Sequence, residues 1–201
     1  MNGENRLVWI DCEMTGLSLE HDALVEIAAI VTDPDLTELD GGITVVIKPE
    51  DSALAQMDEF VQNMHTESGL ITEIPHGITL AEAEELVLAY VKQHVPEARK
   101  AHLAGSSVYV DRGFIARDMP ALDTHLHYRV VDVSSIKELV RRWYPRAYFN
   151  TPEKTGNHRA LADIRESIAE LRYYREAVFV AETGESDALK AIAANHVVDH
   201  G

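Results

Sequence analysis

The chain has 201 residues, of which 46% are hydrophobic, and its formal net charge is −16. This length and hydrophobic fraction suit one globular domain with a sizeable core, and no apolar run is long enough to span a membrane. Proteins that grip long nucleic acids usually present a basic surface. The acidic balance therefore excludes that class of binder, unless the nucleic acid is very short and metal ions offset its charge.

The cellular compartment can be inferred from the N-terminus and from cysteine usage. Residues 1–6 are polar and lack the apolar stretch of a secretory signal. Cys12 is the single cysteine, so no internal disulfide can form. It lies between two acids without a His-Asn/Asp motif beside it, which favours a packed core thiol over a nucleophile. We therefore expect a protein of the reducing cytoplasm.

The first part of the chain predicts three successive strands. An apolar run starts at Leu7, residues 24–32 are typical of a mostly buried strand, and residues 43–47 follow as a third. Turn-forming residues separate the last two strands at 33–35 and again at 40–42. We expect an antiparallel meander that opens a sheet.

Helices and strands alternate in the remainder. We predict helices at 57–69, from 79 to Pro96, at 111–117, from 135 to Pro145 and at 157–180, with strands at 102–104 and 129–133. Capping boxes at 79–82 and 135–138 mark two of the helix starts. The pattern predicts an α/β fold with a mixed sheet flanked by helices. No Gly-x-Gly-x-x-Gly follows a strand, which argues against a dinucleotide-binding Rossmann unit.

Two acids stand close together on the first strand. Side chains alternate along a strand, so Asp11 and Glu13 project to one face, with Cα atoms roughly 6.5 Å apart. Paired carboxylates at the end of a buried strand repel each other and are costly to desolvate. A divalent cation between them would relieve both problems. Taken alone, this short pattern also fits a strand end that simply faces water.

Further candidate residues stand at helix starts. Asp111 opens a helix, where it fits a metal ligand or an ordinary helix-capping aspartate. His158 and Asp163 lie five residues apart, a spacing that does not share one helical face. They can converge if His158 lies at or before the first turn and Asp163 one turn inside. By itself, His158 also fits an exposed histidine without a catalytic role.

The order of these residues is more specific than any of them alone. Asp-x-Glu on the first strand, an aspartate opening a middle helix and His-x-x-x-x-Asp opening a late helix resemble the DEDDh family of 3′→5′ exonucleases. The resembling segments are WIDCEMTGL (9–17), MHTESGL (64–70), residues 105–114, HYRVVDVSSIKELVRRWYP (127–145) and HRALADIRESIAELRYYRE (158–176). The resemblance implies a ribonuclease H-like fold, with one exonuclease domain at 1–180 and a partly helical or flexible tail at 181–201.

The resemblance also implies a metal site and a base. By analogy with the family, Asp11, Glu13, Asp111 and Asp163 hold two divalent cations, Mg²⁺ or Mn²⁺, which prefer oxygen ligands. His158 corresponds to the general base that deprotonates the attacking water, a task that suits the usual pKa of histidine.

Further positions match residues that contact substrate in the family. Leu17 corresponds to the residue that wedges between two bases, and Phe60 stands where the family usually has a tryptophan that stacks on a base. Four residues match positions that recognise the terminal phosphate: His65, Ser107, Arg129 and Ser134. Tyr128 matches a tyrosine supplied by the partner subunit of a homodimer.

This chain departs from the family pattern in several places. Besides Phe60, Val110 replaces an expected glutamine and Gly113 an expected arginine, which puts contacts around the site in doubt rather than the metal ligands. The resemblance implies an exoribonuclease that degrades very short RNA, especially dinucleotides, to mononucleotides. Two alternatives are a DNA-degrading or tRNA-trimming exonuclease acting on longer strands, and an inactive dinucleotide-binding module. The first should be more basic, and the second has no need of His158.

Overall fold

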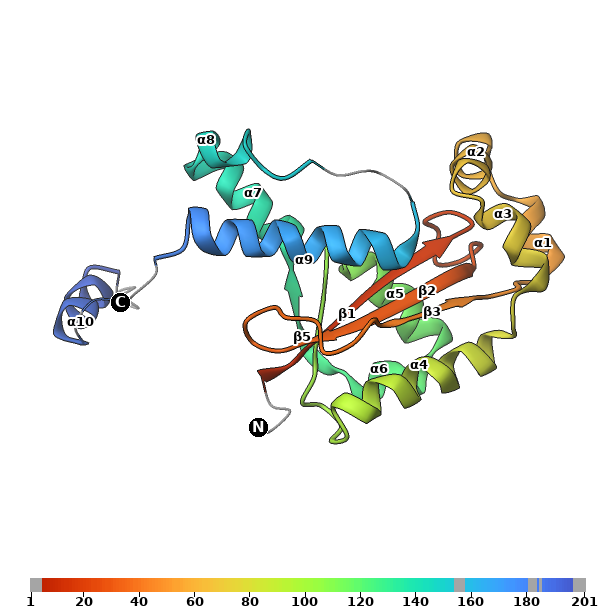
Figure 1. Cartoon of the computed structure of the whole chain (residues 1–201), viewed down its shortest axis with the longest axis horizontal. Coiled ribbons are helices and arrows are strands. Elements are labelled where there is room, and N and C mark those ends of the chain that lie inside the picture. The colour runs from red at the N-terminus through yellow and green to blue at the C-terminus, as the bar shows by residue number, and fades with distance from the viewer. Residues whose placement is uncertain (1–4, 154–157, 181–183, 185, 197–201) are drawn as a thin grey trace, which may run out of the picture.

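The structure is a computed structural model, and it describes residues 5–153, 158–180, 184 and 186–196. Its centre is a mixed sheet with the strand order β3-β2-β1-β4-β5 (Figure 1). The strands are β1 (Leu7–Met14), β2 (Leu24–Thr32), β3 (Ile43–Val46), β4 (His102–Gly105) and β5 (His127–Asp132). β1, β2 and β3 pair antiparallel, whereas β1, β4 and β5 run parallel. The predicted meander and mixed sheet are therefore confirmed.

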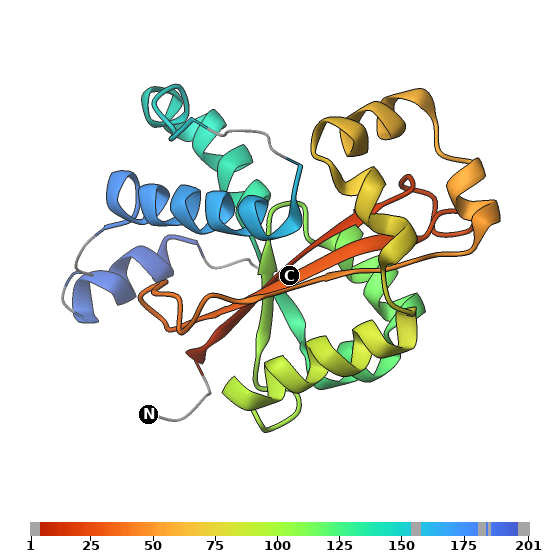
Figure 2. The same ribbon diagram turned by 45° about the vertical axis from the view of Figure 1, so that its right-hand side comes forward.

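Alternation along β1 divides the core into two layers. Val8 and Ile10 face α4 (Leu80–His94), α5 (Tyr109–Asp118) and α6 (Pro120–His125). Trp9 faces the opposite layer, formed by α7 (Val133–Trp143) and α9 (Ala160–Ala177). Figure 2 shows these helix groups on opposite sides of the sheet. Asp11 and Glu13 share the parity of Trp9, so they project toward the layer that contains α9.

Short helices lie beyond the ends of β1 and β2. They are α1 (Asp51–Ala55), α2 (Glu59–Glu67), α3 (Leu70–Glu73) and the 3₁₀ turn η2 (Ile74–His76). We call residues 51–76 the helical arm. It is anchored because Leu70 and Ile74 pack with Val25 of β2. The arm thus stands beside the strand end that carries the paired acids.

The two predicted capping boxes have different outcomes. The box of Thr79 and Glu82 is present at the start of α4. The box at 135–138 is wrong, because α7 begins at Val133 and Asp132 is its cap, accepting a hydrogen bond from the Ser134 amide. Asp132 is therefore both the last residue of β5 and the N-cap of α7.

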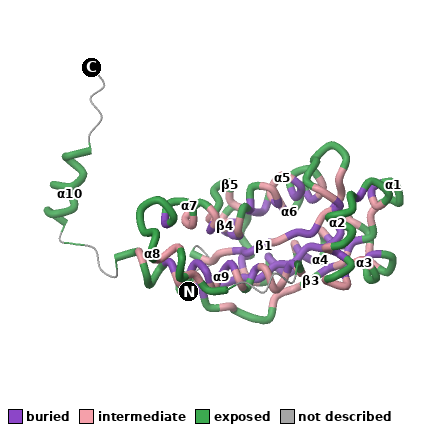
Figure 3. Tube along the Cα trace, turned by 90° about the horizontal axis from the view of Figure 1, so that it is seen from above, coloured by how far each residue is buried: buried purple, intermediate pink, exposed green. Residues whose placement is uncertain are grey.

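Two further elements complete the described chain. α8 (Pro145–Tyr148) follows α7 closely, and α10 (Ser186–Ala194) is exposed along its whole length (Figure 3). The helix expected from residue 157 begins instead at Ala160; Asn157, the expected cap, lies outside the described residues. In the part of the chain that the structure describes, no helix is long and apolar enough to cross a membrane.

Candidate active site

Carboxylates from a strand and a helix converge beside β1. Oxygen atoms of Asp11, Glu13 and Asp163 all lie within 4.8 Å of one another. Asp163 reaches this position because α9 crosses the face of the sheet to which Asp11 and Glu13 project (Figure 1). Asp111, from the first turn of α5, accepts a hydrogen bond from the Cys12 amide at 2.9 Å. All four acids named by the sequence therefore lie around one end of β1.

Burial and mutual repulsion make these acids resist ionisation. Burial, followed by the charges of Asp111 and Asp163, raises the pKa of Asp11 well above its ordinary value. Burial and the charge of Asp163 likewise raise the pKa of Glu13 to about 8. Burial raises the pKa of Asp111 to about 7, although the hydrogen bond from Cys12 opposes this. The charge of Arg159 lowers the pKa of Glu13, but burial and the neighbouring acids outweigh it.

The donor set fits a hard divalent cation. Carboxylate oxygens are the ligands that Mg²⁺ and Mn²⁺ prefer, and a cation would offset the repulsion that raises these pKa values. The cysteine between the two acids does not compete for this role, because Cys12 is buried and points into the layer of α4 and α5. It is a packed thiol, as the sequence indicates.

His158 lies directly before the helix that carries Asp163. The histidine is exposed and precedes the first residue of α9, Ala160, by two positions, whereas Asp163 is in the first helical turn. The backbone of His158 has a positive φ of 47°, which is uncommon for a residue other than glycine. The histidine therefore lies at the N-terminal end of α9.

A second charged cluster, formed by Glu26 and Arg159, holds the N-terminal end of α9. Glu26, fully buried on β2, pairs across the sheet with Glu13. Its carboxylate accepts hydrogen bonds from the Arg159 guanidinium and from the Ala160 amide. The pair of Glu26 and Arg159 was not predicted from the sequence. The available signal was Glu26 itself, a charged residue within nine otherwise uncharged strand residues, since buried glutamate is rare unless paired.

The residues expected to hold bases line one cavity. Leu17 and Phe60 are both largely exposed, and they face a cavity of about 480 Å³ that Glu13, Met14 and Met64 also line. The cavity lies between the end of β1 and helix α2 of the helical arm. The structure therefore brings Leu17 and Phe60 together next to one of the clustered acids.

Two of the residues expected at a terminal phosphate also meet. The Ser107 amide lies 3.1 Å from Ser134 Oγ and donates a hydrogen bond to Asp132 at 2.9 Å. Ser134 Oγ in turn donates to the same carboxylate. Asp132 was not singled out from the sequence, although it organises both serines.

His65 has a different environment from these serines. Its ring is fully buried, Nε2 lies 2.9 Å from the Met14 carbonyl oxygen and Nδ1 lies 4.0 Å from a Glu13 oxygen. Burial lowers its pKa, which favours the neutral ring. In this structure the ring lies behind Glu13, so it supports the acid cluster from within the protein.

Tyr128 and Arg129 lie on the edge strand β5. Tyr128 is 70% exposed, and the Arg129 guanidinium carbon stands 5.4 Å from the centre of its ring. The His127 ring also packs against Tyr128. These two residues therefore form an exposed aromatic and cationic pair on β5, which is an edge strand among the strands that the structure describes.

Comparisons with known proteins agree with this arrangement. An exonuclease family model matches residues 8–171. An oligoribonuclease of Streptomyces avermitilis is 66% identical over 195 residues, covering 96% of this chain and 98% of the relative. An oligoribonuclease of Streptomyces coelicolor is 66% identical over 198 residues, covering 98% of this chain and 99% of the relative.

A solved structure supports the fold independently of sequence. The zinc-bound form of Escherichia coli exonuclease I with single-stranded DNA superposes with a TM-score of 0.66 at 16% identity. The match covers 96% of this chain but only 43% of the length of exonuclease I. The shared architecture, the family match along most of the sequence and the high identity to full-length relatives lead to one assignment. The chain belongs to the oligoribonuclease family of exonucleases.

Proposed function

We propose that this protein is a metal-dependent 3′→5′ exoribonuclease that degrades very short oligoribonucleotides, especially dinucleotides, to mononucleotides. The observation that carries the proposal is the acid cluster of Asp11, Glu13 and Asp163 beside the cavity lined by Leu17 and Phe60. In this proposal, the hydrolytic centre would lie next to the surface that binds the bases. The names of the relatives support the substrate class.

Asp11, Glu13, Asp111 and Asp163 would hold two Mg²⁺ or Mn²⁺ ions. When bound, such ions stabilise the charge that develops on the scissile phosphate and on the leaving oxygen. The raised pKa values of Asp11, Glu13 and Asp111 support this role, because a cation would offset the burial and the mutual repulsion that raise them.

His158 would take the proton of the attacking water. It is exposed at the start of the segment that carries Asp163, so its ring is accessible to a water molecule near the acids. A histidine can act as base at neutral pH because its usual pKa is close to the working range.

The remaining site residues would bind the two ends of a short substrate. Leu17 and Phe60 offer apolar and stacking contacts that read no particular base. Ser107 and Arg129 offer a hydroxyl and a guanidinium donor for a terminal phosphate, with His65 behind the acid cluster. The Ser134 hydroxyl would join them only by exchanging its hydrogen bond to Asp132 for one to the phosphate. A terminal phosphate held in this way would leave little to gain from a third nucleotide. This agrees with the net charge of −16, which disfavours long strands.

A second copy of the chain is the partner that we propose for β5 and α7. β5 has a free edge, and Tyr128 protrudes from it. On α7, Leu139 is 44% and Trp143 66% exposed. Apolar side chains beside an unpaired strand edge favour protein association over exposure to water. In the homodimer, Tyr128 would reach the active site of the partner subunit.

Subunit mixing tests the homodimer. Tyr128→Ala and Asp11→Ala should each be inactive as pure proteins. Their mixture should recover activity, because one hybrid site combines an intact acid cluster with an intact tyrosine. A fully active monomer in light scattering, or a mixture as inactive as its components, would disprove the arrangement.

The most direct test of the activity is to incubate the protein with Mn²⁺ and a labelled 5′-phosphorylated diribonucleotide. We expect mononucleotide products, complete inhibition by EDTA and no turnover by Asp163→Ala. Binding of the dinucleotide without cleavage would favour an inactive binding module. We place the activity in the cytoplasm, which suits a chain whose single cysteine is buried.

A further inference from the structure

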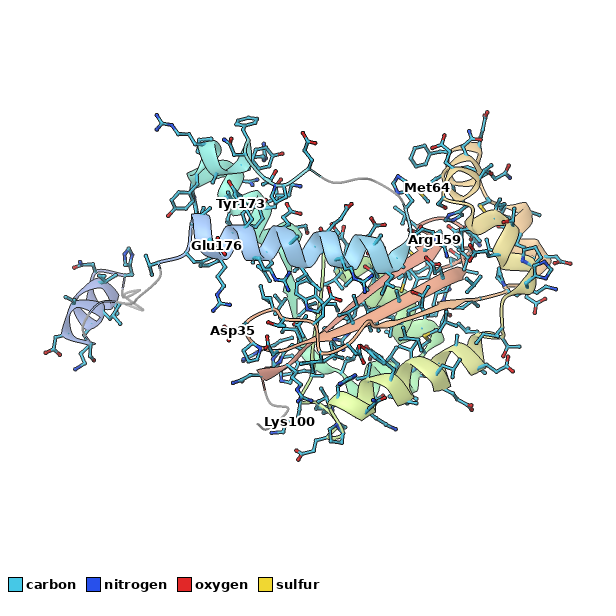
Figure 4. All side chains as sticks on the ribbon, viewed as in Figure 1. Asp35, Met64, Lys100, Arg159, Tyr173 and Glu176 are labelled. Atoms are coloured by element: carbon cyan, nitrogen blue, oxygen red, sulfur yellow. The ribbon has the colours of Figure 1, made fainter. Side chains whose placement is uncertain are left out.

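Arg159 connects three parts of the site that are distant in sequence. It follows His158 directly and is the residue that precedes α9. Its guanidinium donates to Glu26 on β2 and also to Glu73 on α3. Figure 4 labels Arg159 at the end of α9 nearest the helical arm. One side chain thus joins the sheet, the arm and the histidine segment.

The contact between Glu26 and the start of α9 takes the place of an N-cap side chain. No side chain at its own N-cap position accepts a hydrogen bond. Glu26 on strand β2 supplies that acceptor, because its second oxygen lies 2.9 Å from the Ala160 amide. Its first oxygen accepts from Arg159 Nε at 3.1 Å and from Nη2 at 2.7 Å. A fully buried carboxylate is stable only with such partners.

The contact between Arg159 and Glu73 reaches the helical arm, which also carries Phe60. Arg159 Nη1 and Nη2 donate to the two oxygens of Glu73 at 2.8 and 3.0 Å. This is a paired, fork-like geometry, in which position and direction are both specified. Glu73 belongs to the helical arm, as does Phe60, which lines the cavity. The contact between Arg159 and Glu73 therefore connects the helical arm to the residue next to His158.

The backbone of His158 requires such support. Its φ of 47° is a conformation that residues with a Cβ adopt at an energetic cost, so the surroundings must hold it. On one side of His158 lies Arg159, anchored by two carboxylates. Without that anchor the segment would relax to other backbone angles, and the imidazole would move with it.

We propose that Arg159, held between Glu26 and Glu73, is a positioning residue that fixes His158 for proton transfer. The pair of Arg159 and Glu73 further couples the helical arm to the histidine, so that the arm's placement on a substrate and the alignment of His158 depend on each other. This inference rests on the proposed function, because it assigns to His158 the role of base. Arg159 itself touches no reacting atom.

Glu73→Gln is the variant that tests this coupling. The Glu73 side chain is 46% exposed, so we expect its replacement to leave the fold intact, whereas Arg159→Gln would leave buried Glu26 without its charged partner. The matched control is Glu38→Gln, which removes a comparable partner, at 3.3 Å, from Arg165 of the same helix. On a 5′-phosphorylated diribonucleotide with Mn²⁺, we expect Glu73→Gln to lower kcat roughly fivefold with KM little changed. Glu38→Gln should match the wild type.

A double-mutant cycle separates positioning from a general structural effect. In a His158→Ala background, Glu73→Gln should have almost no further effect on kcat, because the residue it positions is gone. Arg159→Lys keeps the charge but cannot make both paired contacts, so its kcat should fall at least as far as that of Glu73→Gln. Equal losses from Glu73→Gln with and without His158 would overturn the proposal.

A measurement without RNA keeps this test independent of the proposed function. Amide hydrogen exchange at Ala160 should accelerate in Glu73→Gln and stay unchanged in Glu38→Gln, since only the first loosens the anchor of α9. Unchanged exchange at Ala160 in Glu73→Gln would refute the anchoring. Failure of the wild-type protein to cleave the dinucleotide would refute the proposed function instead, and the exchange result would still stand.

Discussion

Glu13→Gln should stabilise the metal-free protein while it abolishes metal binding. In the fold, burial and the charge of Asp163 raise the pKa of Glu13 from 4.5 to about 8. A group with a raised folded-state pKa stabilises the protein below its unfolded pKa and loses that contribution as the pH rises through the folded value. The loss for Glu13 therefore develops between pH 4.5 and about 8. It corresponds to roughly 5 kcal/mol at the alkaline end.

A neutral glutamine avoids this loss. If the variant recovers half of the stability that the ionisation of Glu13 removes, its melting temperature at pH 9 should exceed that of the wild type by roughly 5–10 °C for a protein of this size. At pH 5 the wild-type carboxyl is mostly protonated, so the variant and the wild type should melt together. The assay is thermal unfolding in EDTA across this pH range, with Glu85→Gln on the exposed face of α4 as control. Equal melting temperatures at pH 9 would refute the electrostatic reasoning.

Three further outcomes are expected. Mn²⁺ should raise the melting temperature of the wild type more at pH 9 than at pH 5, since protons compete for Glu13 and Asp111; an equal shift at both would contradict this. His158→Ala should lose roughly 10²–10⁴-fold in rate yet keep the Mn²⁺-induced thermal shift, whereas Asp163→Ala should lose both. Phe60→Ala should raise KM for the dinucleotide roughly fivefold or more, as a lost stacking contact of about 1–3 kcal/mol requires; an unchanged KM would remove Phe60 from the substrate pocket.

The strands of the fold could be predicted because the burial pattern of each strand is visible in its own residues. β2 is buried throughout and appears in the sequence as an apolar run. β1 alternates between two layers, which puts Asp11 and Glu13 on one face. A local cue was less reliable where a neighbouring side chain competed for the same role. Ser135 and Glu138 form a plausible capping box, but Asp132 caps α7 three residues earlier, and it also accepts a hydrogen bond from the Ser107 amide.

The acid cluster was accessible to sequence reasoning, whereas its supports were not. Four acids at the ends of predicted elements converge because the sheet and α9 bring them together, and motif order carries that information. Glu26, Glu73 and Arg159 belong to three different elements and meet only in the folded chain. Their pairing depends on the packing of α9 and α3 against the sheet, which no short segment encodes. The single acid within β2 was the one local sign of a buried polar partner.

The central claim is that the site is built for very short RNA. A series of 5′-labelled, 5′-phosphorylated oligoribonucleotides of two to seven nucleotides, at fixed Mn²⁺, tests it most directly. We predict that kcat/KM falls steeply from the dimer onward, and that removing the 5′-phosphate from the dimer raises KM markedly. The net charge of −16, together with a terminal phosphate bound by Ser107 and Arg129 as proposed, would favour this order. Equal kcat/KM on the dimer and the seven-nucleotide strand would contradict the account and indicate a general exonuclease.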